Sequence, residues 1–138
     1  MLQDTKSDLI VGATWFDRPE LESLERERGL ELRQFAEEKI RQIGGDVEIV
    51  WQRETITTSQ FQGRGVGRYL KELVRENFEQ RVQESKRPIL VLTRMREDNH
   101  GIIKINRELG MKGTGIYVPC SLTPGMNHQF WYQVYLPE

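Results

Sequence analysis

An amphipathic segment flanked by two β-branched segments limits this chain to few folds. From residue 66 to residue 85, apolar side chains recur every three or four positions, which is the period of a helix with one buried face. Residues 46–58 before it are rich in β-branched side chains, and residues 88–93 after it are almost continuously apolar. A helix between two such strands predicts a parallel strand pair, and open α/β sheets bind ligands at the carboxyl ends of those strands.

Three glycines at alternate positions, Gly63, Gly65 and Gly67, separate the first predicted strand from the helix. Glycines leave backbone amides unshielded, and the first helical turn adds free amides and the positive end of its dipole. The loop is therefore predicted to hold an anion such as a pyrophosphate. It lacks both the Gly-x-x-x-x-Gly-Lys-Ser/Thr spacing of nucleoside triphosphate loops and the Gly-x-Gly-x-x-Gly spacing of dinucleotide loops.

Length and composition indicate one domain spanning residues 1–138, because 37% hydrophobic content supplies a single modest core. The formal charge of -1 gives the whole protein no attraction to nucleic acid or to an anionic membrane. No apolar run is long enough for a membrane span, so a cytoplasmic location is expected. Cys120 is the single cysteine, which excludes an internal disulfide and a Cys-rich metal site, and no metal is expected. A small buried hydrophobe is a better interpretation of Cys120 than a catalytic thiol.

The rest of the chain adds strands and helices on either side of this unit. Residues 8–16 are predicted to form a strand, and residues 19–43 a broken helix or a helix pair interrupted at Gly29, with Pro19 in its first turn. Asp98 or Asn99 caps a short helix that ends at Gly110. The segment from residue 113 to 138 carries five aromatic residues and a single carboxylate, which predicts an aromatic hairpin.

The loop Gln62-Gly63-Arg64-Gly65-Val66-Gly67 resembles the acyl-coenzyme A pyrophosphate loop of the GNAT acetyltransferase superfamily. The segment from Asn99 to Met111 is similar to the second motif of that family, in which an Asn starts the helix and a Tyr-x-x-x-Gly-Phe ends it. The resemblance covers residues 46–138. It implies an α/β (α+β) fold with a mixed, mostly antiparallel sheet, in which one central parallel strand pair is splayed at the cofactor site and flanked by helices. The N-terminal half is abbreviated relative to the family.

This resemblance implies an N-acyltransferase that moves acetyl from acetyl-coenzyme A to a primary amine of a small molecule or protein by direct attack. The backbone amides of residues 62–67 would hold the pyrophosphate, with added charge from Arg64 and Arg68. The backbone near Thr57 would pair with the pantetheine arm, and Asn99 and Asn106 would contact the cofactor from the second motif.

Attack requires an unprotonated amine, so a base must remove a proton near neutral pH. Glu54 is the predicted base because it lies on the motif strand upstream of the thioester position; Glu48 and His100 are alternatives. Asn106 occupies the position where the family often has a tyrosine, and an amide cannot act as a general acid near neutral pH. Solvent, Tyr117 or the acceptor's own ammonium proton would then protonate the thiolate.

Two other functions fit the same residues. One is an acyl-coenzyme A binding regulatory protein with weak or no catalysis, motivated by Asn106 and the short N-terminal half. The other is a small α/β interaction domain whose glycines serve only turn geometry. An aromatic hairpin with almost no charge also predicts a homodimer. The sequence does not identify the acceptor amine.

Overall fold

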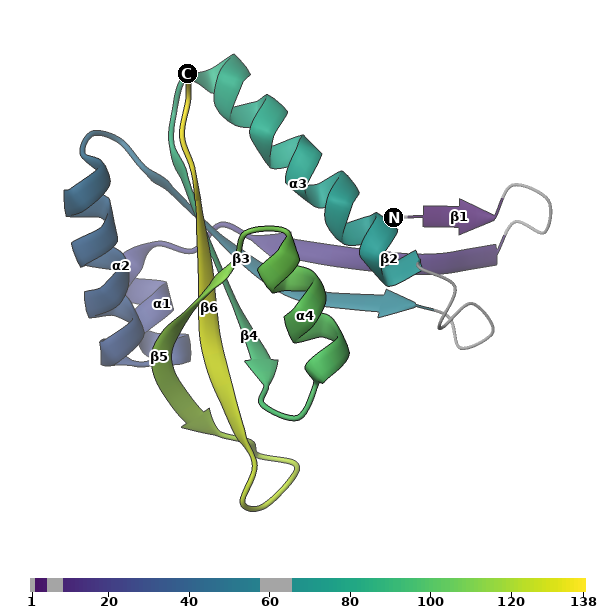
Figure 1. Ribbon diagram of the computed structural model, residues 1–138. Helices are drawn as coiled ribbons and strands as arrows, with labels where there is room; N and C mark the ends of the chain where they lie inside the picture. The colour runs from purple at the N-terminus through teal and green to yellow at the C-terminus, as the bar shows by residue number, and fades with distance from the viewer. Residues whose placement is uncertain (1, 5–8, 58–65) are drawn as a thin grey trace.

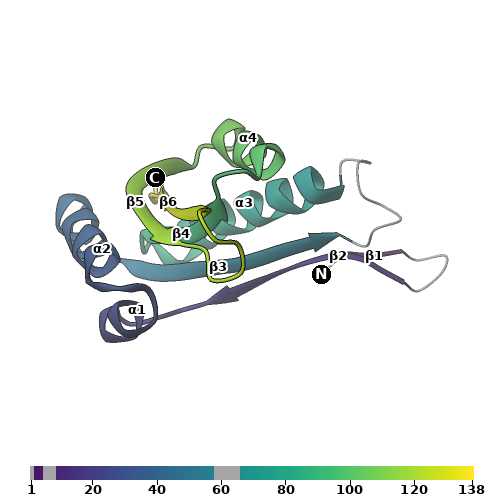
Figure 2. The ribbon, with the colours of Figure 1, turned by 90° about the horizontal axis from the view of Figure 1, so that it is seen from below.

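The computed structural model describes residues 2–4, 9–57 and 66–138, and describes side chains for residues 16–53 and 67–138. The strands are β1 (Leu2–Asp4), β2 (Leu9–Asp17), β3 (Glu48–Thr57), β4 (Ile89–Arg96), β5 (Lys112–Pro119) and β6 (Asn127–Tyr135). The helices are α1 (Leu21–Arg28), α2 (Leu30–Ile43), α3 (Val66–Ser85) and α4 (His100–Glu108). The strands form one sheet in the order β1-β2-β3-β4-β6-β5. Helices α1 and α2 cover one face, and α3 and α4 lie on the other (Figures 1 and 2).

The predicted fold class is confirmed. Strands β3 and β4 are parallel, and every other neighbouring pair in the sheet of the described residues is antiparallel. Helix α3 connects the two parallel strands, as the alternation of β-branched and amphipathic segments predicted. Strand β4 extends to Arg96, beyond the predicted end at residue 93, because it pairs with β6 along its whole length.

Each face of the sheet has its own apolar core. On the α3 and α4 face, side chains such as Val50, Val91 and Trp131 pack against Phe78 and Val82 of α3. On the α1 and α2 face, Leu24, Leu32 and Ala36 pack against alternate residues of the same strands. The alternate residues are Ile49, Trp51, Leu90, Leu92 and Phe130. Burial on both faces explains why β4 reads as an uninterrupted apolar run.

The N-terminal half differs in detail from its prediction. Segment 19–43 forms a helix pair divided at Gly29, whose φ of 103° is costly for residues with a Cβ. Helix α1 begins at Leu21, so Pro19 precedes the helix and is not part of its first turn. The short strand β1 was not predicted, because three residues carry too little pattern to be recognised. Helix α2 leads directly into β3, which agrees with an abbreviated N-terminal half.

The aromatic hairpin forms, and most of its aromatic residues close the protein's own core. Phe130, Trp131 and Tyr135 are buried, and Tyr132 is partly buried against α2, whereas Tyr117 on the edge strand β5 is half exposed. Burial raises the pKa of the Tyr135 hydroxyl well above its usual range. None of the helices in the described ranges is both long and apolar enough to cross a membrane.

Candidate functional site

A gap between the two parallel strands forms the centre of the candidate site. Strands β3 and β4 pair from Glu48↔Ile89 to Trp51↔Leu92, and Thr93 Oγ1 then donates a hydrogen bond of 2.7 Å to the carbonyl of Gln52. Beyond this point β3 still pairs with β2 and β4 still pairs with β6, but β3 and β4 no longer pair with each other. The splay implied by the family resemblance is therefore present, and each strand has a backbone edge that faces the gap.

A cleft of about 350 Å³ lies at this gap. Residues from β3, α3, β4, α4 and the β5–β6 connection line it, which brings together segments that are distant in the sequence. The lining residues are Arg53, Lys71, Thr93, Arg94, Met95, Arg96, Asn99, Ile102, Asn106, Cys120, Ser121, Leu122 and His128. The cleft opens at the carboxyl ends of β3 and β4, the position where open α/β sheets bind ligands.

Two of the predicted site residues, Asn99 and Asn106, line this cleft together. Asn99 caps α4, because its side chain accepts a hydrogen bond from the backbone N–H of Ile102 at 3.4 Å. Asn106 is 2% exposed, and its side-chain amide donates to the Met95 sulfur at 3.0 Å. Asn106 thus lies on the inner face of α4, as its correspondence to the family tyrosine implied.

The remaining predicted cofactor residues are only partly described. Gln62, Gly63, Arg64 and Gly65 lie outside the described residues. Val66 and Gly67 are the first residues of helix α3, and Thr57 is the last residue of β3. For Thr57 and Val66 the structure describes the backbone only. The side chain of Glu54 also lies outside the described part of the chain, although its backbone belongs to the stretch of β3 beyond the last β4 pair.

Arg68 makes contacts that its prediction did not include. Its guanidinium is bound by Glu72 at 3.2 Å and by Glu108 of α4, and both carboxylates raise the pKa of Arg68, with Glu108 the larger cause. The positive charge that Arg68 was predicted to offer to the pyrophosphate is therefore already neutralised by two carboxylates. Arg68 also ties the first turns of α3 to the end of α4, which helps to fix the rim of the site.

The two alternative bases occupy different surroundings. Glu48 lies at the amino end of β3, where its buried carboxylate contacts Arg81 at 2.7 Å, Arg18 at 3.1 Å and Arg87 at 3.8 Å. Because three guanidinium groups bind the Glu48 carboxylate at the strand end opposite the gap, its role is to stabilise the fold. His100 is exposed in the first turn of α4 beside Asn99. Tyr117, the alternative proton donor, is half exposed on β5 and is not among the lining residues of the cleft.

Sequence reasoning missed Lys71, which also lines the cleft. Lys71 is 8% exposed, and burial lowers its pKa to about 8. Within the described residues it has no ion pair, and it follows closely on the first turn of α3, where the helix dipole also disfavours a cation. The signal was available, because Lys71 precedes Val74, Phe78 and Val82 by three, seven and eleven positions and so falls on the buried stripe.

Cys120 of the β5–β6 connection and His128 of β6 complete the wall of the cleft. Cys120 is 9% exposed, as expected for a small buried hydrophobe, yet it lines the cleft. Hydrogen bonding from the Leu122 backbone lowers the pKa of its thiol. Burial, together with the nearby Arg94 and Arg96, lowers the pKa of His128, which keeps this imidazole neutral near pH 7.

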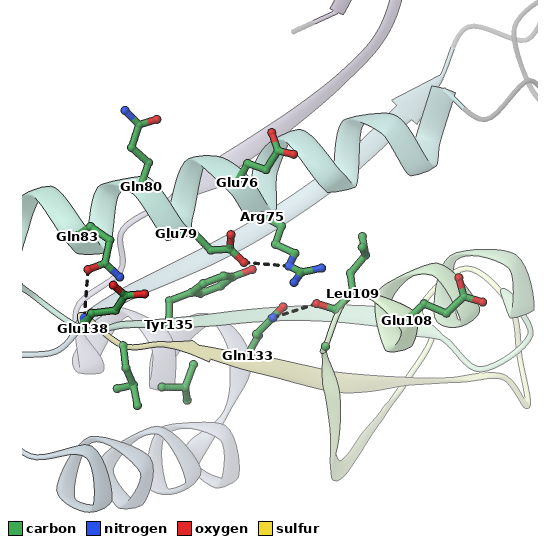
Figure 3. Close-up of a pocket in the computed structure, with 13 residues that line it drawn as sticks. Arg75, Glu76, Glu79, Gln80, Gln83, Glu108, Leu109, Gln133, Tyr135 and Glu138 are labelled. Carbon is green, nitrogen blue, oxygen red and sulfur yellow. Dashed lines mark hydrogen bonds and ion pairs between the residues drawn. The ribbon is translucent and has the colours of Figure 1, made fainter.

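A second, larger depression of about 800 Å³ lies between the middle of α3, the end of α4 and the end of β6 (Figure 3). Some of its polar groups bind one another: Arg75 pairs with Glu79 at 3.0 Å, and the Gln133 side chain donates to the backbone carbonyl of Leu109 at 3.0 Å. This depression is wide and away from the carboxyl ends of the parallel strands. Because open α/β sheets bind ligands at those strand ends, we place the candidate site in the smaller cleft at the gap.

Comparison with known proteins identifies the architecture. No family model and no curated protein matches the sequence. Solved structures do match: ribosomal-protein-S18-alanine N-acetyltransferase from Escherichia coli aligns with a TM-score of 0.53 and 15% identity over 91% of this chain and 96% of that one. Chaetomium thermophilum Naa20, in complex with a bisubstrate analogue, gives a TM-score of 0.58 and 13% identity over 97% of this chain. Salmonella typhimurium yncA, with its cofactor acetyl-CoA, gives a TM-score of 0.57 and 13% identity over 92% of this chain.

The chain has the GNAT fold. It spans 59% of the length of yncA and 64% of the length of Naa20, less than two thirds of either. At these sequence identities the similarity establishes the fold, and the activity has to be argued from the site. The GNAT arrangement agrees with the splayed parallel strands and with the position of α3 directly behind the predicted loop.

Proposed function

We propose that this protein is an N-acyltransferase that transfers acetyl from acetyl-coenzyme A to a primary amine. The observation that carries the proposal is the gap between β3 and β4, which opens beside the amino end of α3. A free backbone edge on each side of the gap suits a ligand that carries amide groups, because such a ligand can pair as an additional strand. The pantetheine arm of coenzyme A carries two amides and meets this requirement.

The residues around the gap suit the cofactor. The amides of residues 62–67 would hold the pyrophosphate at the amino end of α3, with charge from Arg64, and the backbone near Thr57 would bind the arm. Asn99 and Asn106 would border the thioester, since both line the cleft. The yncA structure, which contains acetyl-CoA, supports acetyl-coenzyme A as the donor on this fold.

The proposed reaction is direct attack of the amine on the thioester carbonyl. A C–N bond forms, the C–S bond breaks, and the proton lost by the amine balances the one gained by the thiolate. Glu54 is the proposed base, on the stretch of β3 that borders the gap. Lys71 is a second candidate, because an amine with a pKa of about 8 is partly neutral near pH 7. The bisubstrate analogue bound by Naa20 supports a site in which donor and acceptor are present together.

The decisive experiment measures binding and turnover separately. Titration calorimetry with acetyl-coenzyme A tests the site, and release of free thiol in the presence of polyamines, aminoglycosides, amino acids and lysine peptides tests the reaction. Binding followed by amine-dependent thiol release is expected. Binding without release for any amine would favour the regulatory alternative, and absence of binding would favour the interaction domain.

We also propose a homodimer. Strand β5 is an edge of the sheet, and the hairpin exposes Tyr117 (51%) and Leu122 (88%). Edge strands with exposed apolar side chains pair readily with a second chain. The buried aromatic residues of β6 do not contribute to this argument, because they belong to the protein's own core.

A further inference from the structure

Two arginines flank the gap on the same face of the sheet. Arg53 lies two residues beyond Trp51 on β3, and Arg94 lies two residues beyond Leu92 on β4, where Trp51 and Leu92 are the last paired residues of the two strands. Side chains alternate along a strand, so Arg53 shares the face of Ile49 and Trp51, and Arg94 shares the face of Leu90 and Leu92. This is the face covered by α1 and α2.

A third arginine approaches from α1. The Arg28 guanidinium lies over the Trp51 ring, 4.3 Å from its centroid, and it is half buried. Burial lowers the pKa of Arg28, and repulsion from Arg94 and Arg53 lowers it further. The charges of Arg53 and Arg94 thus both act on the Arg28 guanidinium, and Arg53 and Arg94 also line the cleft. We call these three residues the arginine cluster.

Acidic residues neutralise this cluster only in part. Asp17 contacts Arg53 at 3.4 Å, and Glu27 attracts Arg28, but Arg94 has no ion pair within the described residues. The described lining of the cleft contains no Asp or Glu, while Arg53, Lys71, Arg94 and Arg96 all contribute to it. Of these, Arg96 is already held by Asp98. The described residues of the cleft lining thus carry a surplus of cations, although the net charge of the whole chain is -1.

The two faces of the sheet have different roles under the proposed function, on which this inference rests. Helix α3 lies on one face of the sheet together with α4 (Figure 2), and Lys71 belongs to α3. The predicted pyrophosphate loop directly precedes α3 in the sequence. The cofactor would therefore enter from that face. An amine that reaches the thioester from the opposite face passes the arginine cluster.

We propose that the acceptor is an amine that also carries an anionic group, a carboxylate or a phosphate, and that Arg94, with Arg28 and Arg53, binds this group. Guanidinium groups bind both anions with two parallel hydrogen bonds, which would orient the amine toward the gap. Cationic acceptors such as polyamines would be repelled at the same opening. The transfer itself is the balanced acetyl exchange given above.

Matched acceptors test the charge requirement. Thiol release from acetyl-coenzyme A is compared for free α-amino acids, for the same amino acids as carboxamides, for aminoalkyl phosphates, and for spermidine. We expect kcat/KM to be at least tenfold higher for anionic acceptors than for the carboxamides, and this preference should weaken with added salt. The phosphates and the carboxylates together show which anion is preferred.

Variants then locate the interaction. Arg94→Glu should raise the KM of the anionic acceptor at least tenfold, with the acetyl-coenzyme A Kd within twofold of the unaltered protein. Arg94→Gln removes the positive charge without reversing it, so it should raise the same KM by a smaller factor and is less disturbing to the fold. Arg41→Glu on α2 is the matched control, because this exposed arginine undergoes the same charge change remote from the gap.

Several outcomes would overturn the inference. Equal or better turnover of carboxamides or spermidine would leave the proposed function intact and exclude an anionic acceptor. Loss of acetyl-coenzyme A affinity in Arg94→Glu, with unchanged acceptor KM, would show that the cluster binds the cofactor phosphates instead. Absence of thiol release with every amine would overturn the proposed function, and the inference with it.

Discussion

Asn106 donates its side-chain amide to the sulfur of Met95 across 3.0 Å, and both side chains are buried. This bond links α4 to β4 at the cleft, in the position that the family resemblance assigns to a tyrosine. The amide is thus engaged by the protein itself. Its contribution to chemistry is expected to be through shape and polarity, because an amide does not donate protons near neutral pH.

Asn106→Ala should therefore lower turnover by less than the roughly hundredfold associated with loss of an acid–base catalyst. It should also lower the free energy of unfolding by about 1 kcal/mol, because a buried contact is lost. Asn106→Tyr should be tolerated in activity only if the ring turns into the cleft, and overpacking would cost about 1–3 kcal/mol otherwise. Steady-state kinetics and urea unfolding measure both effects. A thousandfold loss in a folded Asn106→Ala protein would show that the amide takes part in chemistry.

Gly65→Glu is expected to weaken acetyl-coenzyme A binding at least tenfold, or about 1.4 kcal/mol. The added carboxylate would place bulk and negative charge among the amides proposed to hold the pyrophosphate. Calorimetry gives the Kd directly, and Gln80→Glu on the exposed face of α3 is a control that adds a charge away from the loop. Unchanged affinity in a folded Gly65→Glu protein would contradict the proposed loop.

Glu54→Gln is expected to lower kcat by a factor of about 10²–10⁴ if Glu54 is the base, with acetyl-coenzyme A affinity unchanged. The pH profile of kcat should then no longer show the deprotonation of the Glu54 carboxyl group. Glu22→Gln on the exposed surface of α1 serves as the matched control. Retained activity in Glu54→Gln, together with loss in Lys71→Met, would transfer the role to Lys71.

Burial of Lys71 predicts a stability that rises with pH. Its pKa is about 8 in the folded protein against an ordinary 10.5, so the unfolded chain binds more protons between these values. At pH 7 Lys71 is protonated in the unfolded chain and mostly protonated in the folded protein, and burying the ammonium costs about 3 kcal/mol. This cost is relieved as the pH rises from 8 to 10.5. Lys71→Met should raise the free energy of unfolding at pH 7 and flatten the rise, whereas Lys104→Met, at an exposed position, should do neither. Parallel pH profiles for Lys71→Met and the unaltered protein would refute this assignment.

The homodimer predicts a mass of about twice 16.3 kDa in light scattering at tens of micromolar. Leu122→Lys would place a charge on the exposed hairpin and should shift the protein toward the monomer. Because Leu122 is 88% exposed, the same change should leave the fold intact. A monomeric mass for the unaltered protein would remove the dimer from the proposal.

The order of strands and helices could be predicted largely from local patterns. Helix α3 and strand β4 show a clear period and a continuous apolar run, and Gly29 marks the division between α1 and α2. Strand β1 could not be predicted, because its three residues gain their structure from pairing with β2.

The site was predictable only where residues act through a local motif. Asn99 caps the helix that follows it and was identified by that spacing. Lys71 was missed because the buried face of the helix was defined by its apolar residues alone, and a buried cation adds nothing to that pattern. The arginine cluster has no sequence signature, since Arg28, Arg53 and Arg94 come from three separate elements that only the folded sheet brings together.

The position of Arg28 over Trp51 gives the protein an optical readout of its acceptor opening. Trp51 is 4% exposed and is the last residue of β3 that pairs with β4, so its indole stands at the edge of the gap. A cation 4.3 Å from the ring perturbs the electronic states of the indole, and an anion that draws Arg28 aside would change its emission. Replacing Trp15 and Trp131 by phenylalanine would leave Trp51, beside the arginine cluster, as the single tryptophan. Occupancy of that opening could then be followed in real time, without labelled substrates and without turnover.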